Sequence, residues 1–126
     1  MKITIKNVKR AAAPNSEPQF ENTNLLKLIG DNFKIHGDNP NKIYSFIKKD
    51  NELEKIIFDL PNLIKKEFPH DKLQIKFNET ELILEVGIFT SFGEKTSFEK
   101  EKKLENQLYD NYNWDSADKI LIVMEY

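Results

Sequence analysis

The feature that most constrains the fold is an apolar stripe between residues 53 and 68. Seven large apolar side chains recur there at helical spacing: Leu53, Ile56, Ile57, Leu60, Leu63, Ile64 and Phe68. Such spacing places them on one face of an α-helix and leaves lysines and acids for the opposite face. Pro61 falls inside the stripe, so we expect a kink or a tight turn at Asp59–Leu60. The sequence therefore predicts one long amphipathic helix that ends at Phe68–Pro69.

Three strands are predicted after this helix. Residues 72–77 alternate polar and apolar side chains, which is typical of a strand with one wet face. Residues 81–90 are apolar on both faces for most of their length and predict the second arm of a hairpin whose turn is 78–80. Residues 120–124 are an unbroken apolar run, rich in β-branched side chains, which indicates a buried strand.

Two further helices are expected on either side of this hairpin. Asn39–Pro40 offers a cap and a first helical residue for a short helix that runs to Lys49. Thr96 and Glu99 are spaced as a capping box, which predicts the start of the other helix. Its apolar residues recur at intervals of four: Leu104, Leu108 and Tyr112.

The N-terminal part of the chain differs in character. Ile3 and Ile5 alternate with polar residues as in a short strand. Residues 9–24 contain two prolines, Asn and Ser, and are interpreted as irregular. We therefore predict an N-terminal segment over 1–40 and a single α+β domain over 41–126.

The order of strand, helix, strand, strand, helix and strand is that of a ferredoxin-like fold. This fold class is α+β, with a small antiparallel sheet and two helices packed on one face. The last strand would lie at an edge of that sheet, although residues 120–124 are apolar on both sides. We expect the N-terminal segment or a second protomer to cover it. A three-stranded sheet with helices on one face is the alternative.

Four short motifs carry a resemblance: Ile43-Tyr44-Ser45-Phe46-Ile47, Glu67-Phe68-Pro69, Trp114-Asp115 and Glu125-Tyr126. Over residues 42–126 the chain resembles an uncharacterised family of short bacterial α+β proteins. That family usually carries a longer acidic and aromatic run before its Trp than residues 110–113 provide here. The resemblance implies the α+β order of elements and supplies no activity.

Composition excludes several classes of function. The chain has no Cys, two His and a net charge of -2 from 19 basic and 21 acidic residues. Thiolate zinc sites are therefore excluded, and a nucleic-acid partner is disfavoured because phosphate contacts need a basic surplus. The four Gly are scattered, so no phosphate-binding loop and no cofactor are predicted. No apolar run suits a signal peptide or a membrane span, which predicts a cytoplasmic protein without a membrane partner.

Asp71, Glu81 and Glu85 are candidate ligands for a divalent cation. Acidic residues on adjacent strands can hold Mg²⁺ for phosphoryl chemistry. A restriction-type nuclease would need Glu-x-Lys on the second strand, but Val86-Gly87 follows Glu85. A metal-dependent hydrolase or nuclease stays an alternative, and a solvated strand face without metal is the favoured interpretation.

Tyr109, Tyr112 and Trp114 are candidate partner-binding residues. An exposed aromatic cluster can anchor a protein partner, whereas aromatic residues at a helix-to-strand junction more often close the core. No catalytic residue is assigned. We therefore predict a small non-enzymatic protein-interaction module, for example an antitoxin or immunity-type accessory protein. Its partner would be another protein or a second copy in a homodimer. A small-ligand sensor is a further alternative by fold analogy.

Overall fold

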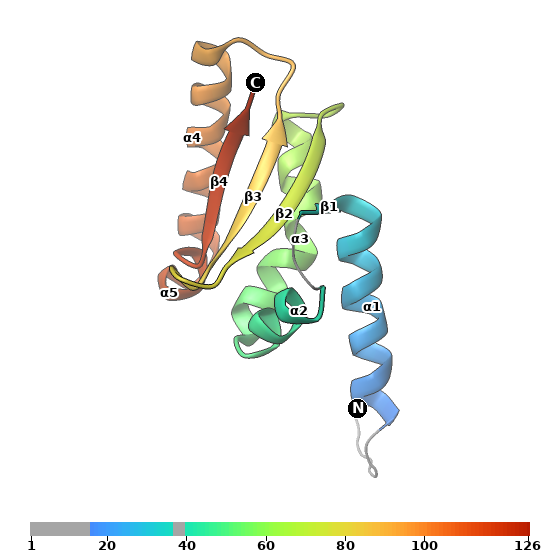
Figure 1. Cartoon of the computed structure of the whole chain (residues 1–126). Coiled ribbons are helices and arrows are strands. Elements are labelled where there is room, and N and C mark those ends of the chain that lie inside the picture. The colour runs from blue at the N-terminus through green and yellow to red at the C-terminus, as the bar shows by residue number, and fades with distance from the viewer. Residues whose placement is uncertain (1–15, 37–39) are drawn as a thin grey trace.

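The computed structural model describes residues 16–36 and 40–126, with side chains from residue 24 onward (Figure 1). The predicted strand around Ile3 and Ile5 lies outside these residues. The elements, in chain order, are α1 (Ser16–Asn32), β1 (Lys34–Ile35), α2 (Pro40–Lys48), α3 (Asn51–Glu67), β2 (Lys72–Asn78), β3 (Ile83–Phe89), α4 (Glu94–Asn111), α5 (Trp114–Ala117) and β4 (Ile120–Glu125).

The four strands form one mixed sheet in the order β1-β2-β3-β4. The β2–β3 hairpin is antiparallel, whereas β1 pairs with β2 and β3 pairs with β4 in parallel. Within each parallel pair, helices connect the two strands and bring the chain back to the end of the sheet at which the first strand begins. The predicted α+β class is confirmed, but the antiparallel sheet is wrong and a ferredoxin-like arrangement is not confirmed.

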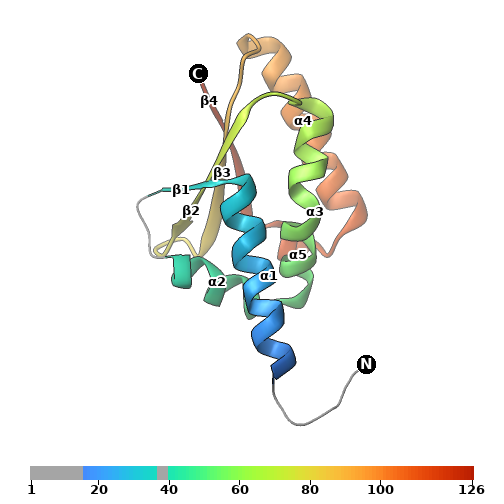
Figure 2. The same ribbon diagram turned by 90° about the vertical axis from the view of Figure 1, so that its right-hand side faces the viewer.

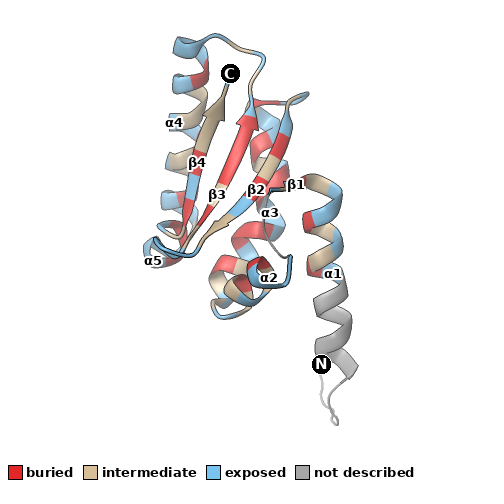
Figure 3. Ribbon diagram, viewed as in Figure 1, coloured by how far each residue is buried: buried red, intermediate tan, exposed pale blue. Residues whose placement is uncertain are grey.

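The helices and the sheet form two layers. Figure 2 shows α1, α3 and α4 on one side of the sheet, while Figure 1 looks onto its other, open face. Alternate residues of β2, β3 and β4 point into the space between the layers, and β3 is buried along most of its length (Figure 3). They meet the stripe of α3, whose fully buried apolar residues are Leu53, Ile56, Ile57, Leu60 and Ile64.

The long predicted helix is confirmed as α3, which continues through Pro61 without the tight turn expected at Asp59–Leu60. Proline inside a helix costs about 3 kcal/mol because it removes a backbone hydrogen bond. Pro61 is itself buried, and Leu60 before it and Ile64 after it are fully buried. Burial of the whole face offsets that cost, so packing decides the conformation here.

The irregular segment predicted for residues 9–24 is wrong from Ser16 onward, because α1 begins there. Pro18 falls in the first turn, where a backbone N–H has no intrahelical acceptor, so proline is tolerated. Farther along, Leu25, Ile29 and Phe33 are buried in the same core cluster as the α2 and α3 residues. Tertiary packing thus makes α1 part of the core.

The second half of the chain holds two more differences. Gly93 precedes α4 and Thr96 lies inside it, so the predicted capping box is wrong. Asn113 caps α5, a short helix that was not predicted, by accepting a hydrogen bond from the N–H of Asp115. Among residues 16–36 and 40–126, no helix combines the length and apolar character needed to cross a lipid bilayer.

Candidate functional site

Trp114 and Tyr109 form an exposed pair where α4 passes into α5, which we call the aromatic corner. Their rings meet edge to face with centroids 6.2 Å apart, and the indole N–H of Trp114 donates to the carbonyl of Tyr109 at 3.0 Å. The Tyr109 hydroxyl donates in turn to Asp118. Trp114 is nevertheless 69% exposed. The structure therefore holds this Trp in one orientation at the surface and leaves the core to other residues.

Tyr112, the third residue of the predicted cluster, has a different position. It is half-buried against the core, and its hydroxyl donates to the carboxylate of Asp59 on α3 at 2.6 Å. Burial and the bond to Asp59 raise the pKa of Tyr112 to about 12. Tyr112 therefore joins the end of α4 to α3 and presents little surface to a partner.

The first turn of α3 anchors the chain around the aromatic corner. One oxygen of Asp50 caps α3 by accepting from the N–H groups of Glu52 and Leu53 at 3.0 and 3.1 Å. Its other oxygen accepts from Ser116 Oγ at 2.7 Å and from Lys119 Nζ at 2.9 Å. Glu52 also accepts from the N–H of Asn113 at 3.1 Å. These bonds fix α5, and Trp114 with it, on the end of α3.

The environment of Asp50 strongly favours its charged form. Burial works to raise its pKa, but hydrogen bonds from Lys119, Ser116 and the N–H of Leu53, with the charge of Lys119, outweigh it. The pKa of Asp50 is lowered from 3.8 to about 2. Asp50 therefore stays ionised at neutral pH and keeps its partners on α5 and just before β4.

The outer edge of β4 continues directly from α5. The carbonyls of Lys119 and Glu125 accept from N–H groups of Leu84 and Thr90 and so face inward. Because backbone groups alternate along a strand, those of Ile120, Ile122 and Met124 face outward. No described strand pairs with that edge.

Apolar side chains also extend onto the open face beside this edge. Leu121 is 45% exposed and Val123 is half-buried. We call β4 together with the aromatic corner the docking strip. The sequence offered one signal for it, an apolar run on both sides of an expected edge strand.

Leu82, in the β2–β3 turn, combines exposure with an unfavourable backbone conformation. Its φ is 58° and it is 59% exposed. It borders a cavity of about 320 Å³ that also touches Phe46 and Phe77. Residues with strained backbones concentrate at functional sites, so the exposed Leu82 is a candidate functional residue. No sequence pattern distinguished it, because only the turn geometry requires the left-handed conformation.

Replacement of Leu82 by glycine is expected to raise the free energy of unfolding by up to about 1.5 kcal/mol. The left-handed region costs a non-glycine residue about 1–2 kcal/mol, and glycine removes this cost. Glycine also loses more conformational entropy on folding, which offsets about 0.5–1 kcal/mol of the gain. Urea denaturation measures the difference. Leu82→Ala is the control, because it removes the side chain and keeps the strain. Destabilisation by the glycine variant would contradict the prediction.

The candidate metal ligands lie apart. Asp71 precedes β2, whereas Glu81 lies in the turn at the far end of that strand, roughly 20 Å away along an extended chain. Glu85 accepts from the amide of Asn78 at 3.0 Å, and Asp71 accepts from the N–H of Ser91 at 3.2 Å. Within the described ranges, no group of three His, Asp or Glu residues is placed to hold a metal ion. The structure thus does not bring Asp71, Glu81 and Glu85 together.

Comparison with known proteins adds no relative: no family model, no curated protein and no solved structure matches this chain. The resemblance of residues 42–126 to short bacterial α+β proteins therefore stays a prediction.

Proposed function

We propose that this chain is a non-enzymatic protein-interaction module that binds its partner through the docking strip. The observation that carries the proposal is Trp114, which is 69% exposed and yet held by Tyr109 through a hydrogen bond and a ring contact. Residues that dominate binding energy are enriched in Trp and Tyr, and a side chain already held in place loses little entropy on binding. This arrangement supports an anchor for a protein surface.

The β4 edge supports strand addition as the binding mode. Outward backbone groups of Ile120, Ile122 and Met124 can pair with an extended segment, while Leu121 and Val123 contact its side chains. Strand addition uses backbone hydrogen bonds for affinity and side chains on alternate positions for specificity. An edge of this kind that stays uncovered favours unspecific association, so a dedicated partner is expected to cover it.

Charge around the strip indicates the chemistry of that partner. Glu85 is the neighbour of Leu121 in the sheet, and Glu125 ends β4. Asp115 and Asp118 lie at the aromatic corner. Lys119, the basic residue directly before β4, is bound to Asp50. We therefore infer a partner segment that alternates apolar and basic residues. An accessory role in the cytoplasm, of antitoxin or immunity type, is the form of this function that we propose.

A crosslinking pull-down from cells that produce the chain tests the proposal. The expected result is a captured protein whose recovery falls sharply with Trp114→Ala, since loss of an anchoring Trp costs about 2 kcal/mol or more, roughly thirtyfold in affinity. Leu121→Lys is expected to act in the same direction, because it places a charge on the apolar strip.

Phe98→Ala is the matched control, because Phe98 is 58% exposed on α4 outside the docking strip. Size-exclusion chromatography with light scattering shows whether the partner is a second copy. Capture that is equal for all variants, or absent for the native chain, would overturn the proposal.

A further inference from the structure

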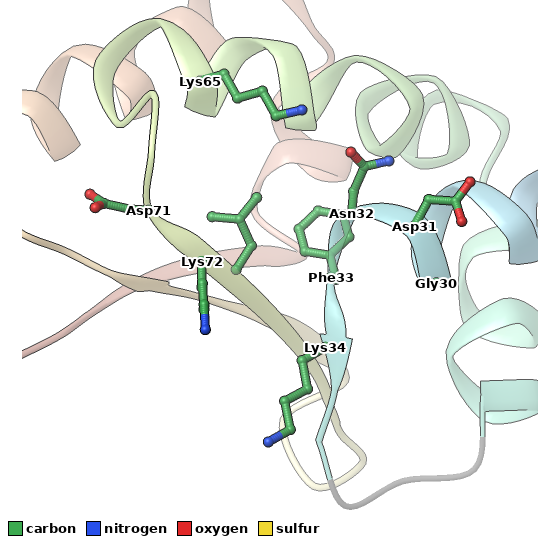
Figure 4. Close-up of a pocket in the computed structure, with 9 residues that line it drawn as sticks. Gly30, Asp31, Asn32, Phe33, Lys34, Lys65, Asp71 and Lys72 are labelled. Atoms are coloured by element: carbon green, nitrogen blue, oxygen red, sulfur yellow. The ribbon is translucent and has the colours of Figure 1, made fainter.

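A cavity of about 410 Å³ lies at the other edge of the sheet, beside β1, and we call it the edge pocket. Residues 30–34, Lys65 and residues 71–73 line it (Figure 4). It exists because β1 is only Lys34–Ile35 and pairs with Gln74 and Ile75 alone. The outer edge of β2 is therefore uncovered at Lys72 and Leu73. The volume of the edge pocket lies in the range of small-molecule binding sites.

The floor of the edge pocket includes two apolar side chains that expose a small part of their surface. Phe33 is 4% exposed and Leu73 is 7% exposed, and both line the cavity. The carbonyl of Ile75 accepts from the N–H of His36 at 3.0 Å, which shows that odd-numbered residues of β2 direct their backbone toward β1. Leu73 follows the same alternation, and β1 has no residue opposite it. Its N–H therefore faces the pocket as a fixed donor.

The rim of the edge pocket carries a positive surplus. Lys34, Lys65 and Lys72 line it, and none of them forms an ion pair with a described residue. Lys65 reaches from α3 toward Asn32, whereas Lys34 and Lys72 extend from the strands on the other side (Figure 4).

Two carboxylate side chains also line the edge pocket. Those of Asp31 and Asp71 point away from Phe33 in the same view (Figure 4). One oxygen of Asp71 accepts from the N–H of Ser91, and its other oxygen is buried without a hydrogen-bond partner among the described residues. The ammonium groups of Lys34 and Lys72 point away from Phe33 as well, so the positive surplus belongs to the rim as a whole, where three lysines stand against two carboxylates.

We propose that the edge pocket binds a small organic anion. Its apolar body would lie on Phe33 and Leu73, and its oxyanion head, a carboxylate or a phosphate, would bind Lys65 and the N–H of Leu73, with the stem of Lys72 turning toward it from the orientation in Figure 4. Charge-assisted hydrogen bonds from ammonium groups are among the stronger polar contacts, and flexible lysine stems adapt to either head group. The edge pocket and the docking strip lie at opposite edges of the sheet, so this inference does not depend on the proposed function.

Isothermal titration of the full chain with phenyl phosphate, benzoate and neutral benzamide tests the proposal. At least one of the two anions is expected to bind and to raise Tm, and benzamide is expected to do neither. Lys65→Gln should weaken anion binding by about tenfold or more, the effect of one charge-assisted hydrogen bond. Lys66→Gln is the matched control, because Lys66 is the next residue of α3, is exposed and does not line the pocket.

The relative affinities of the probes identify the head group and test the apolar contact. Tighter binding of phenyl phosphate assigns a phosphate head, and tighter binding of benzoate assigns a carboxylate head. Inorganic phosphate should bind more weakly than phenyl phosphate, and equal binding would refute the apolar contact. The proposal fails if neither anion binds at about 10 mM, well above a millimolar dissociation constant. It also fails if Lys65→Gln and Lys66→Gln bind as the native chain does, with circular dichroism showing that both are folded.

Discussion

Replacement of Asp50 by alanine is expected to lower the free energy of unfolding by about 3 kcal/mol. Loss of the cap on α3 accounts for about 1 kcal/mol. Ser116 is 3% exposed and would keep a buried hydroxyl without the acceptor it has at 2.7 Å, which costs a further 1–3 kcal/mol or so. Lys119 would lose its partner as well. Urea denaturation followed by circular dichroism measures the change.

The loss of stability in acid provides a second measurement of the contribution of Asp50. Because the pKa of Asp50 is lowered from 3.8 to about 2 in the folded chain, its contribution is complete above about pH 4 and is lost as the pH falls through about 2. The free energy involved is at most about 2 kcal/mol, because Asp50 is partly exposed and solvent screens its charge. The native chain should therefore lose this stability in acid, and Asp50→Ala should show a flatter profile.

Asp110→Ala is the control for both measurements. Asp110 is exposed on α4, and its removal should change the free energy of unfolding by less than about 0.5 kcal/mol. Identical acid profiles for Asp50→Ala and the native chain would show that Asp50 does not hold the ion pair described above. Trp114 fluorescence should also change in Asp50→Ala, since α5 loses its anchor.

Replacement of Phe68 by alanine is expected to cost about 4 kcal/mol, the largest effect that we predict for a single substitution. Phe68 is 1% exposed just after α3, and its ring packs edge to face on Phe92 with centroids 6.0 Å apart. Its removal leaves a cavity between α3 and the loop before α4. Thermal unfolding should show a Tm lower by about 10 °C or more.

Two further variants define the origin of that effect. Phe68→Leu keeps most of the volume and should cost about 1.5 kcal/mol. Phe98→Ala removes the same type of ring from a site that is 58% exposed and should change stability by less than about 0.5 kcal/mol. Similar losses in Phe68→Ala and Phe98→Ala would mean that the end of α3 is not packed as described.

The elements that could be predicted from the sequence are those whose pattern is local and strong. The stripe of α3, the alternation of β2 and the apolar run of β4 each specify their own period, and all three lie where expected. The start of α1 could not be predicted, because Pro18 signals irregular chain and only burial of Leu25 and Ile29 outweighs that signal.

The candidate site could likewise be predicted only in part from the sequence. The sequence identified Tyr109, Tyr112 and Trp114 as a cluster but could not separate the exposed Trp from the half-buried Tyr112. That distinction depends on Asp59 and the other α3 carboxylates, which come from a distant part of the chain. The sequence grouped Asp71 with Glu81 and Glu85 as acidic residues of the hairpin, but the seven-residue strand β2 places Asp71 and Glu81 at its opposite ends.

By itself, the sequence determined the class of the fold and the identity of its main elements, because side-chain periodicity decides which face of a helix or strand can be buried. Only the tertiary structure decided how the strands pair and which apolar residues remain exposed. Pairing depends on contacts between segments far apart in the chain, and a local pattern carries no information about a distant partner. The exposed positions of Trp114 and Leu121, and the short β1 that opens the edge pocket, follow from that arrangement.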